Sequence, residues 1–396
     1  MSAGEDTAPI RVAHVITRLC KGGAQENTFH TVRLSRDSRF ESDLLSGMAP
    51  ANDISLEPGI LRADIPIEHL PALLRDPAPL SDLRALFQLY QIFRARRYTI
   101  VHTHTSKAGL LGRIAARWAG VPIIIHTPHG NIFHGYFSSP KTRLFVALER
   151  WAAGFTDRII ELTPGGIEEH LAQGIGRREQ FRVIFSGIDL APCLDAPRRR
   201  AETRRALQIP DNAIVVGAVG RLEPVKGFRY LADAARLLED SGLPLYFLVA
   251  GDGSERAMLE AETHDLKAGW RFLGFREDIP ALMAAFDMLV VPSVNEGMGR
   301  VVLEAGAVGT PVIASHVGGI PDVLTQDETG LLVKAQDSRA LADAIMLLAK
   351  DPALRAHLGA TARQRIVPRY SLEAMVAEIH ALYEELLHER SHHPRR

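Results

Sequence analysis

The sequence predicts an α/β fold built from two doubly wound, Rossmann-like domains. With 396 residues, the chain is long enough for two domains that each bury a core. Short apolar runs rich in β-branched residues alternate with amphipathic segments in the first half, and the same alternation begins again near residue 214. Because this alternation is typical of parallel strands joined by helices, each half is expected to form its own sheet.

The expected elements follow one another along the chain. Strands are expected at 10–16, 100–102, 123–125, 182–185, 214–219, 246–250, 287–293 and 312–314, and helices at 23–35, 107–119, from 299 onward and at 371–387. An apolar stripe at helical spacing indicates the last helix and implies that one of its faces is buried. The polar, proline-bearing stretch at 195–200 is the best linker candidate, so domains are expected at 1–192 and 199–369.

Composition places the chain among ordinary globular proteins. Hydrophobic residues make up 46% and charged residues 23%, and the net charge of −1 offers no argument for nucleic acid as a partner. Cys20 and Cys193 are the only cysteines, which favours a reducing compartment over a disulfide framework or a cysteine zinc site. The N-terminus lacks the features of a signal peptide and no apolar stretch reaches 18 residues, so a cytoplasmic protein without membrane spans is expected.

Two carboxylates, Glu296 and Glu304, stand eight residues apart around a glycine-flanked turn after the strand at 287–293. A helix N-terminus attracts phosphate, because its first N–H groups lack intrahelical partners and carry the positive end of the helix dipole. The N–H groups in question are those of Gly299, Arg300 and Val301. Glu304 lies about 7 to 8 Å farther along the axis, which suits a ribose diol, and Glu296 suits a sugar beyond the phosphates. A surface loop glutamate and an ordinary helical glutamate are the competing interpretation.

Two cations, Arg221 and Lys226, lie five residues apart in the loop after the strand at 214–219. Open α/β sheets bind ligands at the carboxyl ends of their strands. Cations placed there would neutralise a phosphate leaving group, and such charge stabilisation commonly supplies a large share of catalysis. The flanking glycines favour this interpretation over two solvated loop cations.

Glycines and histidines follow the strands of the first half in the same way. Gly22 and Gly23 stand between the first strand and a helix, where glycine lets the backbone approach a phosphate, although Gly-Gly is also a common turn. His129 follows the strand at 123–125, and a merely structural histidine is its alternative. His102 and His104 alternate along a strand and suggest a metal pair, but spacing places no third ligand, so acceptor-side lining or plain strand polarity is favoured.

The segment 293–311 closely resembles the Glu-x7-Glu signature of retaining glycosyltransferases with the GT-B fold, most like family 4. The resemblance covers nearly the full chain and implies two Rossmann-like domains facing a cleft, with a C-terminal helix, here 370–390, that crosses back to the first domain. It also implies transfer without a metal or another cofactor. Met298 stands where the family usually has Phe, and Arg300 where an uncharged residue is common; both departures bear on the donor sugar.

The resemblance also implies roles for individual residues. The implied catalytic residues are His129, Glu296, Arg221 and Lys226, and the implied donor-binding residues are Gly22, Gly23, Arg221, Lys226, Gly251, Gly299, Arg300, Val301 and Glu304. The two cations would clamp the donor diphosphate, and the two glutamates would hold the sugar and the ribose. The histidine would face the positive charge that develops near the anomeric carbon.

Positive charge is concentrated in residues 84–158, where eleven Lys or Arg stand against two acidic residues in a nearly neutral chain. Such asymmetry indicates an anionic partner. Many similar enzymes use lipid-linked acceptors at the inner membrane face. The stretch 94–97 and the helix with Arg113 and Arg117 are therefore expected to lie on anionic lipid. Charges scattered over several solvated faces are the alternative.

Together these features predict a cytoplasmic enzyme, peripheral at the inner membrane face, that transfers a hexose with retention from a UDP- or GDP-linked donor to a hydroxyl acceptor. The expected acceptor is a lipid-linked saccharide or another cell-envelope glycan precursor, contacted by the aromatic loop at 131–140. Two alternatives are a nucleotide-sugar 2-epimerase of the same fold and a non-catalytic nucleotide-sugar-binding regulatory subunit. A dehydrogenase is disfavoured, because no Gly-x-Gly-x-x-Gly opens either half.

Overall fold

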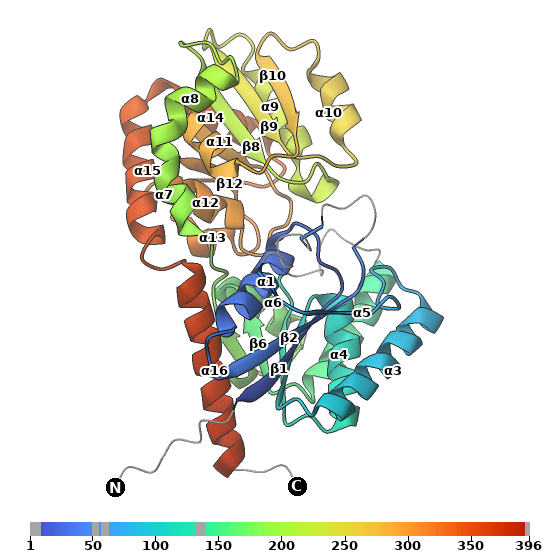
Figure 1. Cartoon of the computed structure of the whole chain (residues 1–396). Helices are drawn as coiled ribbons and strands as arrows, with labels where there is room; N and C mark the ends of the chain where they lie inside the picture. Colours follow the sequence, from blue (N-terminus) through green and yellow to red (C-terminus); the bar gives the residue numbers. More distant parts are fainter. Residues whose placement is uncertain (1–8, 50–54, 57–62, 131–138, 393–396) are drawn as a thin grey trace, which may run out of the picture. The chain divides into compact units, whose positions relative to one another are not determined.

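The computed structural model describes residues 9–49, 55–56, 63–130 and 139–392 (Figure 1). It confirms two α/β units, each built on a parallel sheet. The first unit contains the described residues up to Gly187 together with those from Leu372 on, and the second contains Ile188–Ser371. In the described part of the chain, no helix has the length and apolar character needed to cross a membrane. The aromatic loop expected at 131–140 lies almost entirely outside the described residues.

Seven parallel strands form the sheet of the first unit, in the order β3-β2-β1-β4-β5-β6-β7. Their bounds are Ile10–Ile16 (β1), Phe40–Ser46 (β2), Ile67–His69 (β3), Ile100–His104 (β4), Ile123–Thr127 (β5), Arg158–Glu161 (β6) and Phe181–Val183 (β7). β1 pairs with both β2 and β4, so the order of the strands reverses between β1 and β4. Loops at the carboxyl ends of these two strands diverge and leave room for a ligand.

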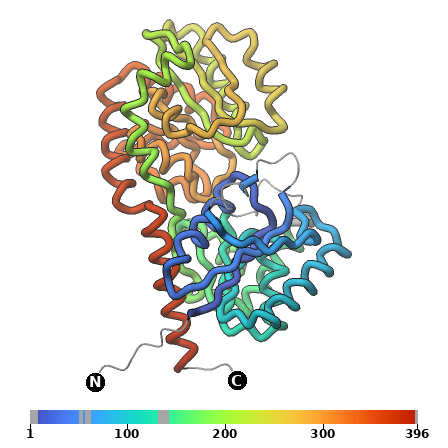
Figure 2. The backbone as a smooth tube through the Cα atoms, viewed as in Figure 1, coloured from blue at the N-terminus to red at the C-terminus, as the bar shows by residue number. Residues whose placement is uncertain are grey.

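Helices cover both faces of this sheet. They are Gly23–Ser35 (α1), Pro79–Arg96 (α3), Ser106–Ala119 (α4), Ser139–Ala153 (α5), Pro164–Ala172 (α6) and Leu372–His392 (α16), with a 3₁₀ turn at Arg178–Gln180 (η1). α4 packs between α3 and α5 (Figure 1). α16 lays the apolar stripe predicted at 371–387 on Val12, Ile100 and Ile125 of the sheet, and runs beside α1 (Figure 2). The predicted return of the last helix to the first unit is therefore confirmed.

Six parallel strands form the sheet of the second unit, in the order β10-β9-β8-β11-β12-β13. The strands are Ile214–Val219 (β8), Leu245–Ala250 (β9), Gly269–Gly274 (β10), Met288–Val291 (β11), Val312–Ser315 (β12) and Gly330–Val333 (β13). The helices are Phe228–Leu237 (α9), Arg256–Thr263 (α10), Ile279–Ala285 (α11), Arg300–Val308 (α12), Ile320–Val323 (α13), Ser338–Lys350 (α14) and Pro352–Ile366 (α15), with a 3₁₀ turn at Pro224–Lys226 (η3). The order reverses between β8 and β11.

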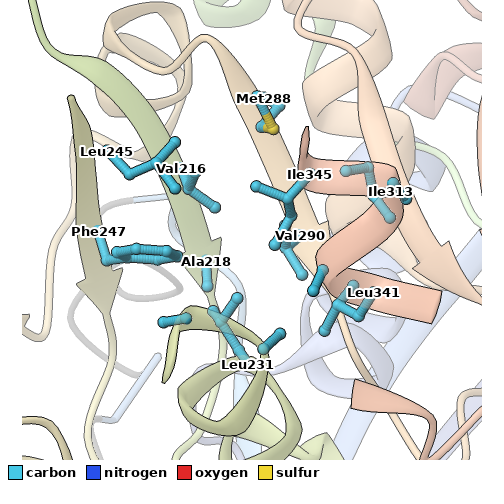
Figure 3. Close-up of a cluster of buried hydrophobic side chains, with 14 of the residues drawn as sticks. Val216, Ala218, Leu231, Leu245, Phe247, Met288, Val290, Ile313, Leu341 and Ile345 are labelled. Carbon is cyan, nitrogen blue, oxygen red and sulfur yellow. The ribbon is translucent and has the colours of Figure 1, made fainter. Parts of the chain in front are cut away.

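The core of the second unit explains why its strands read as continuous apolar runs. Phe247 and Val290 point from the sheet toward Leu231 of α9 and Ile345 of α14 (Figure 3). Val215 precedes Val216 of this core, so it faces the opposite side of the sheet, and it is also fully buried. Strands buried on both faces lose the alternation of apolar and polar residues, as in other parallel sheets.

Residues 195–200, which the sequence indicates as a linker, are helical. They belong to Leu190–Asp195 (α7), Ala196–Arg199 (η2) and Arg200–Ala206 (α8). Arg200 holds this segment in the second unit by donating to the carbonyl oxygens of Ala284 and Phe286, both at 2.6 Å. The chain instead enters the second unit at Ile188, whose N–H donates to the Tyr370 carbonyl at 2.9 Å. Ile188 also pairs in parallel with Ser371, the last residue before the chain returns.

Candidate active site

The cations and carboxylates predicted in the second unit lie on the segments that follow β8 and β11, the two strands at its point of strand reversal. Arg221 and Lys226 follow β8, Glu296 follows β11, and Glu304 lies on α12. Two backbone contacts join the loops after β8 and β11. The N–H of Val294 donates to the Val225 carbonyl at 2.9 Å. Gly227 adopts φ +66°, and a Cβ on it would stand only 2.2 Å from the carbonyl oxygen of Pro292.

This backbone contact brings Lys226 and Glu296 together. Lys226 Nζ lies 2.5 Å from Glu296 Oε2, and Ser293 Oγ donates to the same oxygen at 3.1 Å. The two charged side chains are 24% and 15% exposed, so water screens their attraction only in part. The site therefore offers an ammonium donor and a carboxylate acceptor side by side. Such a pair is suited to a ligand with both anionic oxygens and hydroxyl groups.

Arg221 and Gly251 belong to the loops that follow the neighbouring strands β8 and β9. Arg221 forms an ion pair with Glu223 at 2.6 Å and is half exposed, so its guanidinium is accessible to solvent. Gly251, at the end of β9, has φ +135°, and a Cβ there would lie 1.9 Å from the carbonyl oxygen of Gly220. The Gly251 N–H donates to the Gly274 carbonyl at 2.8 Å. The glycine thus lets three strand ends close on one another.

α12 begins directly after the turn that carries Glu296. Gly299 is its N-cap in the left-handed region at φ +76°, and Arg300 and Val301 occupy the first turn, as predicted. Met298 is 2% exposed, so this departure from the family pattern fills a core position rather than a site surface. Glu304 is half buried on the second turn.

Glu304 has a buried thiol as its neighbour. Burial first, and then the negative charge of Glu304, raise the pKa of Cys193 on α7 to about 12. Cys193 is therefore a neutral thiol that packs beside the carboxylate. Since a reactive cysteine requires the thiolate, this residue is structural.

A third loop, which is not among the predicted parts of the site, supports Glu296. Gly318 and Gly319 follow β12, and the N–H of Gly319 donates to the Glu296 carbonyl at 3.2 Å. Gly318 has φ +50°, and a Cβ on it would stand 1.8 Å from the same oxygen. The signal available in the sequence is a Gly-Gly pair two residues after an apolar run, the same signal that indicates Gly22 and Gly23.

The predicted residues of the first unit also lie at carboxyl ends of central strands. Gly22 caps α1, which starts at Gly23, and its carbonyl accepts the N–H of Glu26 at 3.0 Å. His129 stands two residues beyond β5 with φ +62°. Left-handed backbone is unfavourable for a residue with a side chain, and such positions are concentrated at functional sites. The His129 ring contacts His104, the last residue of β4.

A row of buried histidines leads away from His129. The His129 Nε2 lies 2.9 Å from His104 Nδ1, and His104 Nε2 lies 3.0 Å from His14 Nδ1 on β1. His102 bonds through Nδ1 to the Tyr383 hydroxyl and through Nε2 to Thr127, both at 2.7 Å. Potential metal-ligand atoms of His14, His102 and His104 lie within 4.8 Å of one another. The structure thus adds a third histidine, from β1, to the pair noted in the sequence.

Burial keeps these histidines uncharged. It lowers the pKa of His14 to about 3, and it lowers the pKa of His102 and His104 well below the usual value, with smaller contributions from neighbouring histidines. Burial, followed by the charge of Arg113, has the same effect on the pKa of His126. The His126 ring is enclosed against Gly109 and bonds to Thr103, whereas the His129 ring is only half buried.

Arg113 does not lie on the surface expected to face lipid. Its guanidinium is fully buried, and its NH2 nitrogen donates to both carboxylate oxygens of Glu149 at 2.7 Å. Arg96 is partly buried and pairs with Glu68 and Asp43. Arg94, Arg97 and Arg117, by contrast, are exposed. The amphipathic spacing in the sequence could not separate these groups, because Arg113 occupies the inner face of α4.

Two family models match the chain. The model described as glycosyl transferases group 1 matches residues 199–365, and the model described as glycosyl transferase 4-like domain matches residues 15–187. The two matches fall on the second and the first unit, respectively.

Several known proteins are similar over nearly the full length. The chain is 30% identical over 384 residues to UDP-Gal:alpha-D-GlcNAc-diphosphoundecaprenol alpha-1,3-galactosyltransferase from Escherichia coli, covering 96% of this chain and 97% of that one. It is 27% identical over 342 residues to the capsular polysaccharide biosynthesis glycosyltransferase CapM from Staphylococcus aureus, covering 82% and 87%. The crystal structure of HepE from Anabaena in complex with UDP and glucose superposes with a TM-score of 0.81 at 25% identity, covering 95% and 100%.

Proposed function

Because the chain belongs to the group 1 glycosyl transferases, whose members transfer sugars from nucleotide donors, we propose that it is a retaining hexosyltransferase with a UDP-hexose donor. The proposed acceptor is a hydroxyl of a lipid-linked saccharide. The E. coli relative is named for UDP-galactose and a diphosphoundecaprenol acceptor, and the Anabaena structure contains UDP and glucose. These names favour UDP over GDP among the two donors that the sequence leaves open.

The observation that carries this proposal is the Lys226–Glu296 pair at the point of strand reversal. On donor binding, Lys226 would exchange its carboxylate partner for the diphosphate, and Glu296 would accept hydrogen bonds from the donor sugar. Arg221 would add a second positive charge. A charge-assisted hydrogen bond contributes about 1.5 to 3 kcal/mol, so two of them at the leaving group would stabilise the breaking bond substantially.

The proposed chemistry places the remaining site residues in support of this step. The acceptor oxygen would bond to the anomeric carbon on the face from which the diphosphate leaves, and the acceptor proton would move to the departing phosphate oxygen. Glu304 would bind the ribose, and Gly22 and Gly23 would approach the phosphate. His129 would stand near the anomeric carbon. Neither a metal nor another cofactor is required for this sequence of steps.

Titration calorimetry with UDP, GDP and ADP tests the donor site. Wild type is expected to bind UDP in the micromolar range, and Glu304→Ala to weaken binding about tenfold or more by removing a ribose partner. Glu262→Ala, on the exposed side of α10, is the matched control and should leave the affinity unchanged. Failure of wild type to bind any of the three nucleotides would contradict the proposal.

Product analysis separates the proposed reaction from its alternatives. Incubation with UDP-hexoses should release UDP and free sugar slowly, with the α anomer formed first when the donor is an α-linked hexose. An altered sugar still joined to UDP would indicate epimerase activity, and binding without any release would indicate a regulatory subunit.

The outer face of α3 supports contact with a membrane. Exposed apolar side chains at Leu80, Leu83 and Phe87 share this face with Arg84 and Arg94 at helical spacing. Apolar groups flanked by arginines on one helix face are typical of segments that insert shallowly into anionic bilayers. Exposed Trp118 lies on α4, which packs against α3, and exposed Leu144 and Trp151 lie on α5, which packs against α4.

Cosedimentation with phosphatidylglycerol vesicles at low and high salt tests this face. Wild type is expected to bind at low salt and to dissociate in part at high salt, because arginine contributes about 1 kcal/mol per residue near an anionic surface. Leu83→Gln combined with Phe87→Gln should weaken binding at least tenfold, whereas Leu237→Gln, which changes a leucine on α9 that is also more than half exposed, should not. Salt-insensitive binding, or no binding, would exclude the proposed contact.

A further inference from the structure

We propose that His104, supported by His14, is a positioning residue that fixes the tautomer of His129, so that His129 accepts a hydrogen bond at Nε2 and carries its hydrogen at Nδ1. The assignment of a catalytic task to His129 rests on the proposed function. The tautomer itself is a property of the first unit alone, so the two can be tested separately.

The three rings form one hydrogen-bonded row across the ends of three adjacent strands. His129 follows β5, His104 is the last residue of β4, and His14 lies on β1. The bonds between them are 2.9 and 3.0 Å long. The ring planes differ by 27° for His129 and His104 and by 15° for His104 and His14, so neighbouring rings are nearly parallel, as suits in-plane hydrogen bonds between them. Each bond uses a different nitrogen of His104.

Neutral imidazoles make such a row directional. A neutral ring has one N–H donor and one lone-pair acceptor. His104 and His14 are fully buried, and desolvation keeps both rings uncharged near neutral pH. If His129 donates to His104, then His104 must donate to His14, and a hydrogen is left on His14 Nε2. If instead His14 donates to His104 and His104 donates to His129, then His14 Nε2 carries only a lone pair and His129 carries its hydrogen on Nδ1.

The buried end of the row decides between these directions. His14 Nε2 is buried and has no hydrogen-bond partner among the described residues. An unpaired buried N–H is rarer in proteins than an unpaired buried acceptor, so the lone pair is the favoured group at this position. The row therefore ends in a lone pair at His14. His14 donates to His104, and His104 donates to His129.

Neighbouring side chains complete the surroundings of the row. On the α16 side, Tyr383 bonds to His102 rather than to the row, and the charge of His380 opposes protonation of His14. His102 itself is satisfied by Tyr383 and Thr127. Because both nitrogens of His102 and of His104 are already bonded, the cluster fits a hydrogen-bond row better than a metal centre, which would need lone pairs from all three rings.

A fixed tautomer has a chemical consequence at His129. The ring presents an N–H group at Nδ1 and cannot exchange it for a lone pair without reversing two buried hydrogen bonds. The left-handed backbone at φ +62° further restricts its orientation. His129 would thus act on its substrate as a hydrogen-bond donor and dipole in a constant orientation, which is the property expected of a preorganised polar group.

Nitrogen NMR of the full chain labelled with ¹⁵N-histidine tests the tautomer directly. Protonated and unprotonated ring nitrogens have distinct shifts, and His129→Gln identifies the signals of His129. The expected result in chelator-treated protein at pH 7.5 is an unprotonated Nε2 and a protonated Nδ1. A protonated Nε2, a mixture of tautomers, or a stoichiometric metal ion in protein before treatment would each overturn the proposal.

Variants at position 104 test the positioning role. Asn can place an amide donor near the position of the lost Nδ1–H, so His104→Asn should keep the tautomer and most of the donor turnover. His104→Leu should lose the fixed tautomer and lower kcat for UDP-hexose hydrolysis about 10- to 100-fold, with KM and UDP affinity nearly unchanged. His102→Asn, two residues away on the same strand, is the control and should leave the His129 signals in place.

The outcomes distinguish this proposal from the proposed function. If wild type neither binds UDP nor hydrolyses a UDP-hexose, the function fails while the NMR result on His129 stands. If turnover is normal but His104→Leu changes neither kcat nor the His129 tautomer, the positioning role fails alone. Should His104→Leu not fold, the wild-type spectrum and His104→Asn still decide the direction of the row.

Discussion

Gly227 determines where Lys226 lies, although it has no side chain of its own. Its left-handed backbone ends the short turn after β8, and its missing Cβ leaves space for the Pro292 carbonyl of the neighbouring loop. Two loops that are separated by about seventy residues in sequence can then touch. The ion pair between Lys226 and Glu296 depends on this approach, so a backbone property sets the distance between two charged groups.

Replacing Gly227 by alanine should therefore cost more than left-handed strain alone. Gly227→Ala is expected to lower the free energy of unfolding by about 3 kcal/mol, because the new Cβ adds a clash to the strain. Gly242→Ala is the control and should cost about 1 kcal/mol, since Gly242 has φ +69° but a Cβ there would meet no described atom within 4 Å. Urea unfolding of both variants gives the comparison, and equal losses would contradict the role of the Pro292 contact.

Single residues differ in how far the sequence can predict their positions. Arg221, Lys226 and Glu296 are predictable because each follows an apolar run, and residues after parallel strands collect at one edge of a sheet. The place of His14 in the histidine row could not be predicted in this way. It depends on β1 pairing with β4, and nothing local in either strand specifies that partner.

The helix α16 packs on the sheet of the first unit and against α1, which are far from it in sequence. Its apolar stripe closes the core of the first unit, and its polar groups reach specific partners there. Tyr383 bonds to His102, His380 bonds to Ser35 at 2.8 Å, and the Met375 sulfur accepts from Asn27 at 3.0 Å. α16 thus supplies hydrogen-bond partners to buried polar side chains on β4 and on α1.

Removing one hydroxyl from α16 should destabilise the first unit measurably. In Tyr383→Phe, the Nδ1 of His102 loses its partner inside the core, and the free energy of unfolding is expected to fall by about 1 to 3 kcal/mol. Tyr90→Phe removes a hydroxyl from a partly exposed position on α3 and should change the free energy of unfolding by less than about 0.5 kcal/mol. Chemical unfolding followed by circular dichroism measures both, and equal stability of the two variants would show that the His102 contact contributes nothing.

Elements with a strong apolar pattern can be predicted from the sequence, and strands interrupted by charged residues cannot. The β-branched runs of β1, β5 and β8 are visible in the sequence because these strands are buried on both faces, and the apolar stripe of α16 is visible because one face of the helix is buried. β2 gives no such signal, since its Glu41 and Asp43 interrupt any apolar run. Asp43 is tolerated there because Arg11 and Tyr98 approach it from other elements, a tertiary compensation that no local pattern reveals.

At the scale of the whole molecule, buried histidines connect stability to pH. Burial lowers the pKa of His14 to about 3 and that of three others, His102, His104 and His126, well below the usual value. In the unfolded chain these rings have pKa values of about 6.5. The unfolded state therefore binds more protons than the folded state below that pH, and the stability present above pH 6.5 is lost as the pH falls toward the folded pKa values.

The free energy of unfolding should accordingly decrease between pH 6.5 and pH 5. Each of the four histidines contributes a slope on the order of 1 kcal/mol per pH unit to the free energy of unfolding. Burial raises the pKa of Glu161, so this one carboxyl group contributes a slope of the opposite sign. Urea unfolding at pH 7.5, 6 and 5 measures the slope. His357→Gln, at an exposed position on α15, should leave it unchanged, and a stability independent of pH over this range would contradict neutral burial of the histidines.

The bridge between Ile188 and Ser371 has an evolutionary consequence. The chain leaves the first unit and returns to it at adjacent points, so the second unit has the connectivity of an insertion whose ends already meet. A block with this connectivity can be exchanged for a homologous one by recombination at the two points of the gene that encode its ends, without altering the path of the remaining chain, because those ends are neighbours in the fold. Ligand preferences in the two units can then be inherited separately, and new pairings can arise from the shuffling of intact halves.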